Sequence, residues 1–427
     1  MTTLSTLKPT QQIGFLNAFF AGVPLEDVSI QLPNGTVWPD DQPRAAVITL
    51  TRPDALALLF GAPDERTLAE AFLRGDVDVV GDLGAAVELA DVLAARGGVK
   101  QELLRTWLQV TRRPASPPQG KGWRRWRDFA GARHTRERDR QAVSFHYDVS
   151  NEFYQLWLDP RMIYSCAYFE ERAADLATAQ TAKLEYLCRK LRIQPGQHVL
   201  DIGCGWGGFA LYAARHHHVR VRGITLSERQ AQLATTRVKE AGLESEITIE
   251  LRDIRDVEET EAFDAIVSVG MSEHVGRKQL PGYFGKVANL LRPGGAFLNH
   301  AIGHGVIPRR AHGEAFMQEM VFPDSETPAI PTVLAAGEGE GLEVRDVENL
   351  REHYQLTLRH WAARLEAQRS AASATVDERT FRMWRLYLAS AARNFERGHL
   401  AIYQALFAKP DGRGNAHVPL TRRDWYV

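Results

Sequence analysis

The sequence predicts an α/β fold: a doubly wound, mostly parallel sheet in the larger part of the chain, preceded by a smaller N-terminal α+β unit. From residue 141 onward, short apolar runs alternate with helical segments, which is the pattern of βαβ units. One run, residues 199–201, leads into a glycine-dense turn at 203–208 and then into a helix. With 427 residues, the chain is also longer than one hydrophobic core usually covers, so two domains are expected.

The composition is that of a globular protein, with 44% hydrophobic and 25% charged residues. The net charge of -1 argues against a globally basic nucleic-acid binder. Three cysteines, Cys166, Cys188 and Cys204, are too few for a disulfide framework and favour a reducing cytoplasm. No apolar run approaches the roughly 20 residues of a membrane-spanning helix. Residues 13–23 come nearest and are expected to bury one face of a helix, so we expect any membrane contact to be peripheral.

Residues 1–110 are expected to form the small α+β unit. Asn34-Gly35 lies between two apolar segments, and this pair favours the tight turn of a β-hairpin within residues 28–38. Patterning places the other elements of the unit, which are strands at 46–50 and 77–80 and helices at 54–60, 67–74 and 83–95. No group of residues in this unit has the spacing of a catalytic site.

Residues 111–140 are expected to be a basic linker. Proline and glycine interrupt regular structure there, and lysines and arginines outnumber acidic residues by ten to three between Arg112 and Arg140. Trp123 and Trp126 lie among the arginines. A solvated tether is one interpretation; adhesion to anionic lipid headgroups is another, since basic side chains and interfacial tryptophans both favour such surfaces. Nucleic acid fits less well, because no recognition module accompanies the segment.

The catalytic part is expected at residues 141–427, where strands and helices alternate. Strands are predicted at 199–201, 219–225, 247–251, 265–269 and 296–302, and helices at 183–190, 209–216, 228–241 and 280–291. Thr225, Asp253 and Glu273 follow predicted strands, as the glycine turn does. Open parallel sheets bind ligands beyond the carboxyl ends of their strands, so this edge is expected to hold the site.

The glycine turn has the spacing Gly203-x-Gly205-x-Gly207-Gly208, whereas the dinucleotide fingerprint requires G-x-G-x-x-G. Glycine adopts positive φ and has no Cβ, so such a turn lets the backbone approach a ligand closely. Taken alone, the turn is also compatible with an ordinary strand-to-helix connection. Its full form, Leu-Asp-Ile-Gly-Cys-Gly-Trp-Gly at 200–207, resembles the first motif of class I S-adenosylmethionine (SAM) methyltransferases. That resemblance implies a Rossmann-like catalytic domain with SAM as the methyl donor.

Seven separated segments, in order, extend this resemblance to the cyclopropane fatty acid synthases and their mycolic acid cyclopropane relatives. The segments lie at 146–148, 164–169, 203–208, 223–227, 273–276, 300–303 and 352–358. The resemblance is dense over residues 141–427 and loose over the N-terminal unit. It implies transfer of a methylene group from SAM to the cis double bond of an unsaturated phospholipid acyl chain, which forms a cyclopropane ring.

The resemblance also implies that a bound bicarbonate ion is the base that removes a proton as the ring closes. Its expected ligands are Cys166, Glu273, His300, Tyr354 and the backbone of Ile302. The set is chemically coherent, because a histidine, a tyrosine, a thiol and a backbone N–H can donate to an oxyanion while the carboxylate accepts. Each residue alone also has a structural explanation, as a buried thiol, a hydrogen-bonded histidine or a packed aromatic side chain. No metal site is expected, because Glu273 is not part of an H-E-x-x-H motif.

For SAM, the resemblance implies a set of contact residues spread over the strand ends. They are Tyr147 at the sulfonium; Tyr164 and Ser165 at the methionine carboxylate; Asp201, Gly203, Gly205 and Gly207 at the glycine turn; Thr225, Leu226 and Gln230 at the ribose; and Asp253 and Ile254 at the adenine. An aromatic face beside a sulfonium stabilises its positive charge.

Other functions stay open on the sequence alone. The same donor and substrate give a methylene- or methyl-branched chain when the cation loses its proton elsewhere. A non-catalytic lipid-binding protein and methyl transfer to a small molecule or nucleic acid are further classes. We expect a cytoplasmic enzyme at the inner face of the membrane, where the N-terminal unit and Arg124, Arg125, Trp126 and Arg127 dock on anionic phospholipids. A homodimer is one of the oligomeric states compatible with the sequence.

Overall fold

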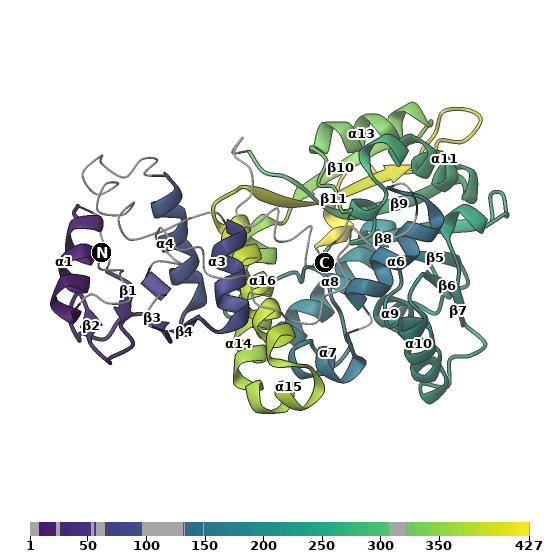
Figure 1. Ribbon diagram of the computed structural model, residues 1–427. Coiled ribbons are helices and arrows are strands. Elements are labelled where there is room, and N and C mark those ends of the chain that lie inside the picture. Colours follow the sequence, from purple (N-terminus) through teal and green to yellow (C-terminus); the bar gives the residue numbers. More distant parts are fainter. Residues whose placement is uncertain are drawn as a thin grey trace. The chain divides into compact units, whose positions relative to one another are not determined.

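Figure 1 shows the computed structural model of the protein. The structure describes residues 8–22, 26–52, 55–56, 65–95, 131, 133–147, 149–306, 321–322 and 324–426, without the side chains of 65–67, 90–95 and 143–147. These residues form two compact units. The first contains the described residues up to 95 together with 376–393, and the second contains 131–306, 324–375 and 394–426.

Among the described residues, the first unit has a four-stranded sheet with the order β2-β1-β3-β4. Its elements are α1 (Pro9–Phe19), β1 (Val28–Gln31), β2 (Val37–Trp38), β3 (Ala46–Leu50), α3 (Glu65–Arg74), β4 (Val77–Gly81) and α4 (Leu83–Ala95). β1 pairs antiparallel with β2 across a turn in which Gly35 has a φ of 87°, which confirms the predicted hairpin. The other predicted strands and the helices from 67 and 83 are confirmed, whereas the helix predicted at 54–60 lies largely outside the described residues.

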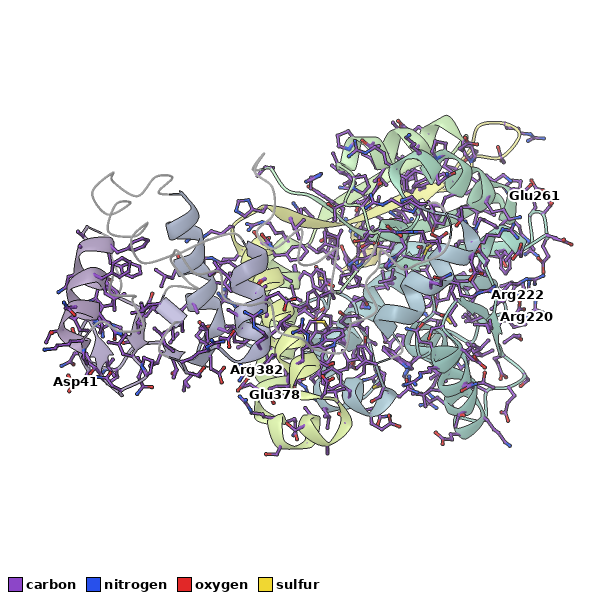
Figure 2. All side chains as sticks on the ribbon, viewed as in Figure 1. Asp41, Arg220, Arg222, Glu261, Glu378 and Arg382 are labelled. Carbon is purple, nitrogen blue, oxygen red and sulfur yellow. The ribbon has the colours of Figure 1, made fainter. Side chains whose placement is uncertain are left out.

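A helix from late in the sequence packs into the first unit. α16 (Glu378–Glu396) directs Arg382 and Arg385 at Asp78 on β4, with ion-pair distances of 2.9 and 3.4 Å. Arg382 also pairs with Glu378 one turn earlier, and Figure 2 labels these two side chains. The sequence does not reveal this association, because an arginine-rich helix usually faces solvent. The boundaries predicted at 110 and 140 stay predictions. Residues 96–130 are outside the described part, and residue 140 lies inside the helix α6 (Arg136–Tyr147).

In the described part of the second unit, a seven-stranded sheet has the order β10-β11-β9-β8-β5-β6-β7. The strands are β5 (His198–Ile202), β6 (Arg220–Thr225), β7 (Ile247–Leu251), β8 (Phe263–Val269), β9 (Leu291–His304), β10 (Glu343–Asn349) and β11 (Leu400–Ala408). The helices are α6 (Arg136–Tyr147), α7 (Asn151–Trp157), α8 (Leu176–Leu191), α9 (Gly208–His217), α10 (Glu228–Glu240), α11 (Leu280–Leu290), α13 (Ile330–Gly339), α14 (Arg351–Ala367) and α15 (Arg369–Thr375). β11 runs antiparallel to both β9 and β10, and the other neighbouring strands are parallel.

The elements predicted between residues 183 and 302 are all present, although α8 begins earlier, at Leu176. The strands β10 and β11 were not predicted. Two layers of helices cover the sheet, because successive residues of a strand point to opposite faces. Val199 of β5 packs with residues of α8, α9 and α10, whereas the next residue, Leu200, packs with α11 and α13. Figure 1 shows α9 and α10 on one side of the strands and α11 and α13 on the other, which confirms the doubly wound α/β prediction.

The predicted membrane-facing features are tested only in part by this fold. Leu16 of α1 and Phe20, its C-cap residue, are buried in the core of the first unit, so the described part of residues 13–23 buries one helix face as predicted. None of the described helices is both long enough and apolar enough to cross a bilayer. The basic linker, with its predicted docking residues Arg124, Arg125, Trp126 and Arg127, lies outside the described residues.

Candidate active site

A cavity of about 420 Å³ lies at the carboxyl edge of the sheet in the second unit. Its walls come from the segments that follow β5, β6, β7 and β8, which is the edge where open α/β sheets bind ligands. Its volume is within the usual range of small-molecule pockets. The cavity therefore lies at the edge of the sheet where the sequence predicted the ligand site.

The glycine turn forms one wall of the cavity. Gly203, Gly205 and Gly207 have φ values of 79°, 54° and 78°, all in the left-handed region that favours glycine. A Cβ on Gly203 would lie 3.2 Å from the Met271 side chain, so the turn packs tightly against the segment after β8. Gly203 and Gly205 line the cavity, and Gly207 lies just behind them as the N-cap of α9. The turn thus presents backbone to a ligand.

Most of the residues predicted to contact SAM line this one cavity. They are Tyr164, Ser165, Asp201, Gly203, Gly205, Thr225, Leu226, Gln230, Asp253 and Ile254. Gly207 is not part of the lining, and the side chain of Tyr147, the last residue of α6, is outside the described part. Four segments far apart in the sequence are therefore brought together, while the contacts of each residue with SAM stay predictions.

A hydrogen-bonded group holds the wall where β6 meets α10. Thr225 Oγ1 donates to Gln230 Oε1 at 2.8 Å and accepts from the Ser227 N–H at 3.2 Å. Ser227 also caps α10, because its Oγ accepts from the Gln230 N–H at 3.2 Å. The cap fixes the first turn of α10 and with it the position of Gln230 in the cavity wall.

Asp253 follows β7 and is held by Arg255. The guanidinium donates from Nε to Oδ1 at 2.9 Å and from Nη2 to Oδ2 at 2.5 Å. Burial raises the pKa of Asp253, but the hydrogen bonds from Arg255 outweigh burial and hold the pKa below its usual value. At neutral pH the carboxylate is therefore ionised and fixed in orientation, as an acceptor for ligand hydroxyl or amino groups requires.

Three buried polar side chains to which no role was assigned from the sequence hold the segment around Ser165. Gln180 of α8 donates from Nε2 to the Ser165 carbonyl at 2.9 Å, and Lys183 donates to Ser165 Oγ at 2.9 Å. Thr357 of α14 accepts a backbone N–H from the same segment at 3.0 Å. Their signal in the sequence was the presence of polar residues at helical spacing within otherwise apolar helix faces.

Glu273 lies in the single helical turn after β8 and is 6% exposed. Its Oε1 accepts a hydrogen bond of 2.7 Å from the Ile302 N–H on β9, whereas Oε2 has no hydrogen-bond partner among the described residues. Burial raises the pKa of Glu273 to about 7, and the hydrogen bond from Ile302 acts in the opposite direction. The carboxyl group is therefore able to gain or lose a proton near neutral pH.

His300 lies two residues before Ile302 on β9, and its ring is fully buried. Nδ1 is 3.2 Å from Nε2 of Gln404 on β11, and within the described part of the chain the histidine Nε2 has no partner. When the Gln404 amide donates to Nδ1, the ring proton is on Nε2, which is then a donor without an acceptor. Burial lowers the pKa of His300 well below its usual value, so the ring is neutral at neutral pH.

Cys166 and Tyr354 both contact the carbonyl oxygen of Leu350. The thiol sulfur is 3.9 Å from this oxygen, and the Tyr354 N–H donates to it at 3.0 Å. The Leu350 N–H donates in turn to the carbonyl of Ile402, which lies opposite Ile302 across β9 and β11. These mostly backbone contacts link the segments that carry the residues predicted to bind bicarbonate. None of the five residues lines the cavity, and their contact with an anion stays a prediction.

The chemistry of this group fits a small oxyanion. Glu273 offers an acceptor and His300 a donor that have no protein partner among the described residues, and buried polar atoms without partners point to a bound ligand or water. Bicarbonate has both a hydroxyl donor and acceptor oxygens. Burial raises the pKa of the Cys166 thiol, which leaves it protonated, and in this structure the thiol donates to the Ala167 carbonyl at 3.2 Å. The Ile302 N–H already donates to Glu273, so a bound anion would share or replace that hydrogen bond.

Comparison with known proteins agrees with this geometry. A family model described as mycolic acid cyclopropane synthetase matches residues 134–405. A probable fatty acid methyltransferase of Pseudomonas putida is 40% identical over 397 residues, covering 91% of this chain and 95% of that protein. The cyclopropane-fatty-acyl-phospholipid synthase of Escherichia coli (strain K12) is 38% identical over 264 residues, covering 62% of this chain and 66% of that protein. The crystal structure of mycolic acid cyclopropane synthase CmaA1, complexed with SAH and CTAB, matches with a TM-score of 0.60 and 33% identity over 63% of this chain and 97% of that chain.

The strand order, the glycine turn at the carboxyl edge and the SAH-bound structural relative define a SAM-dependent methyltransferase. The chain belongs to the mycolic acid cyclopropane synthetase family, as the ordered motifs of its sequence predicted.

The raised pKa of Glu273 predicts how stability depends on pH. Folded Glu273 keeps a proton up to about pH 7, whereas the unfolded chain releases it near 4.5. Between these values the folded state binds more protons, so stability falls as the pH rises through this window and the loss is complete above it. Glu273→Gln removes this titration and is expected to raise the free energy of unfolding at about pH 8 by up to ~3 kcal/mol, a gain that disappears towards pH 5.

Urea unfolding of both proteins at several pH values in bicarbonate-free buffer measures this difference. Glu258→Gln is the control, because Glu258 is exposed and its replacement is expected to leave the pH dependence unchanged. A Glu273→Gln variant that was less stable than the parent at pH 8 would contradict the prediction.

Proposed function

We propose that this enzyme transfers a methylene group from SAM to the cis double bond of an unsaturated phospholipid acyl chain and closes a cyclopropane ring. The observation that carries the proposal is the buried pair of Glu273 and His300, each with a polar atom that has no partner among the described residues. The pair lies next to the cavity, since His274, which follows Glu273, is part of the lining. Ring closure must remove one proton from the transferred methyl group, and a buried site for a base meets that need.

The first task of the chain is to hold two weakly reactive partners in line. SAM, when bound, supplies a methyl group on a positively charged sulfur. An alkene is a weak nucleophile, so close approach and exclusion of water must provide much of the rate. The glycine turn brings backbone to the donor, Thr225 and Gln230 offer polar atoms to hydroxyl groups, and Asp253 offers an ionised acceptor.

The second task is to remove a proton without attacking the cation. Bicarbonate, when bound, supplies a base that is a poor nucleophile. His300 would orient it through Nε2, with Gln404 fixing the tautomer of the ring. Glu273 would accept its hydroxyl proton, and a pKa of about 7 lets this carboxyl group hold or release a proton during turnover.

A second product is compatible with the same donor and substrate. If a hydride shifts along the acyl chain before the proton is lost, the product is methylene-branched and has the same mass as the cyclopropane. The names and coverage of the relatives are a reason to retain the methylene-branched product as a second candidate. The P. putida relative matches 91% of this chain, N-terminal unit included, and is a probable fatty acid methyltransferase, whereas the E. coli cyclopropane synthase matches 62%.

Incubation with methyl-labelled SAM and vesicles of dioleoyl phosphatidylglycerol, followed by NMR of the lipid extract, tests the proposal. We expect the upfield proton signals of a cyclopropane ring. Signals of a vinylidene group would establish the branched product instead, and a lipid that stays unchanged would overturn both candidates.

His300→Ala is expected to lower turnover by on the order of 10²–10⁴, because the base loses the residue that orients it. The affinity for S-adenosylhomocysteine should change little, since His300 is not part of the cavity lining. Steady-state kinetics and calorimetry separate the two quantities. His216→Ala, at the exposed end of α9, is the control and should alter neither. Parallel losses of turnover and nucleoside binding would count against the assignment.

We also propose that the N-terminal unit and the basic linker hold the enzyme on anionic membranes. The support is the sequence itself, in which Arg124, Arg125, Trp126 and Arg127 combine positive charge with an interfacial aromatic residue. Reversing the three arginines to glutamate is expected to abolish sedimentation with anionic vesicles while S-adenosylhomocysteine still binds. Wild-type binding should weaken as salt is raised, because exposed charges are screened over about 8 Å at physiological salt. Salt-independent binding that survives the charge reversal would refute this role.

A further inference from the structure

Lys183 is a buried cation with no ion-pair partner in the described part of the chain. It lies on α8, lines the cavity and is 2% exposed. Its Nζ donates to the neutral Ser165 Oγ at 2.9 Å, and among the described residues no carboxylate oxygen lies within 4.0 Å of it. Burial lowers the pKa of Lys183 to about 8, with Cys166, Asp159 and Asp201 acting in the opposite direction. The ammonium group is therefore mostly charged at neutral pH.

A second buried lysine on the same helix shows how different this environment is. Lys190 is 0% exposed, and its Nζ contacts Asp346 at 3.3 Å and Glu348 at 2.5 Å. Two protein carboxylates thus compensate the charge of Lys190. Lys183 has one hydroxyl group in place of them and faces the cavity, so the compensating anion is expected to come from a ligand.

Asp201 is an acidic residue in the same cavity wall, one residue before the end of β5. It is 3% exposed, and its Oδ2 has no hydrogen-bond partner among the described residues. Burial raises the pKa of its carboxyl group to about 7, and the charge of Lys183 acts in the opposite direction. No carboxylate oxygen of Asp201 lies within 4.0 Å of Lys183 Nζ, so the two residues form no ion pair. The cavity wall therefore carries a buried ammonium group and, apart from it, a buried carboxyl group, which is an arrangement that suits a zwitterion.

The charges of the methyl donor determine how it can lie in this cavity. SAM carries one negative group, its carboxylate, and two positive groups, its α-ammonium and its sulfonium. Charges interact strongly where water is excluded, so a positive group of the donor next to Lys183 would be repelled. Only the carboxylate end is attracted to that part of the wall.

We propose that Lys183, together with Ser165 Oγ, holds the carboxylate of the methyl donor, while Asp201 faces its α-ammonium group. Lys183 is then a donor-positioning residue: it fixes the direction of the amino-acid end and, through the short chain to sulfur, the place of the sulfonium. Gln180 supports the same arrangement, because it holds the Ser165 carbonyl one helical turn away from Lys183. The inference rests on SAM being the donor and is independent of which acyl product is formed.

The test compares two ligands that differ only in the carboxylate. Calorimetry measures the binding of S-adenosylhomocysteine and of its decarboxylated analogue, S-adenosyl-3-thiopropylamine, to the full-length protein. We expect the wild type to prefer the carboxylate form by about 10- to 100-fold, the range of a charge-assisted hydrogen bond. In Lys183→Met this ratio should fall towards one, mainly through weaker binding of the carboxylate form. Kinetics should show a raised KM for SAM with a smaller change in kcat.

Lys286→Met is the matched control, because Lys286 lines the same cavity from α11 and carries the same charge. This variant should keep the wild-type ratio. An unchanged ratio in Lys183→Met, or equal weakening of both ligands, would overturn the proposal and leave Lys183 a structural residue. If Lys183→Met does not fold, the same ratio is measured for Lys183→Gln. The wild type alone also tests the proposal, because equal affinity for the two ligands would refute it. Failure here would leave the lipid product test unaffected.

Discussion

The hydrogen bond from the Ile302 N–H to Glu273 Oε1 is the interaction on which the catalytic geometry depends. It joins the turn after β8 to the strand β9. The two strands are parallel neighbours, and their register places Val269 beside His300. A carboxyl group held this deep in the protein costs free energy unless its oxygens are satisfied. The backbone satisfies one oxygen, which leaves the other as the group with which a ligand can interact. This single backbone donor thus fixes the position of the Glu273 carboxyl group and leaves its Oε2 available to a ligand.

Pairing and burial act differently on the ionisable groups of the site. On the donor side, Arg255 keeps Asp253 ionised and the ammonium of Lys183 is mostly protonated, whereas burial raises the pKa of Asp201 to about 7. On the base side, burial neutralises: it raises the pKa of Glu273 and lowers that of His300. The donor side thus offers fixed charged groups to a ligand that is itself charged. On the base side, neither group is held in its charged form, as the proton transfer that we propose requires.

The parts of this structure that local pattern determines could be predicted from sequence. The glycine turn, the hairpin at Asn34-Gly35 and the alternating elements between 183 and 302 follow from turn chemistry and periodicity over a few residues. The edge of the sheet that binds the ligand could be predicted as well, because the carboxyl ends of parallel strands lie at the same edge. The ordered motifs then predicted which residues would gather there.

What could not be predicted depends on partners far away in the sequence. β10 carries charges that argue against a strand, and only its pairing with β11 makes it one. The arginines of α16 look solvent-exposed until Asp78, about three hundred residues earlier, is placed beside them. The burial of Lys183 was not predicted, because a lysine is ordinarily a surface residue even when its neighbours on the helix face are apolar. Each of these needed tertiary contacts that spacing does not encode.

The antiparallel strand β11 has a consequence for how the enzyme comes into being. It is the last strand of the sheet in sequence order, yet it lies between β9 and β10 and carries Gln404, which contacts His300. The residues that line the cavity, of which Lys286 is the last in the sequence, are all synthesised before β11. The ring of His300 gains its neighbour Gln404 only when this final strand has been made. The order of synthesis therefore completes the cavity lining first and the surroundings of His300 last.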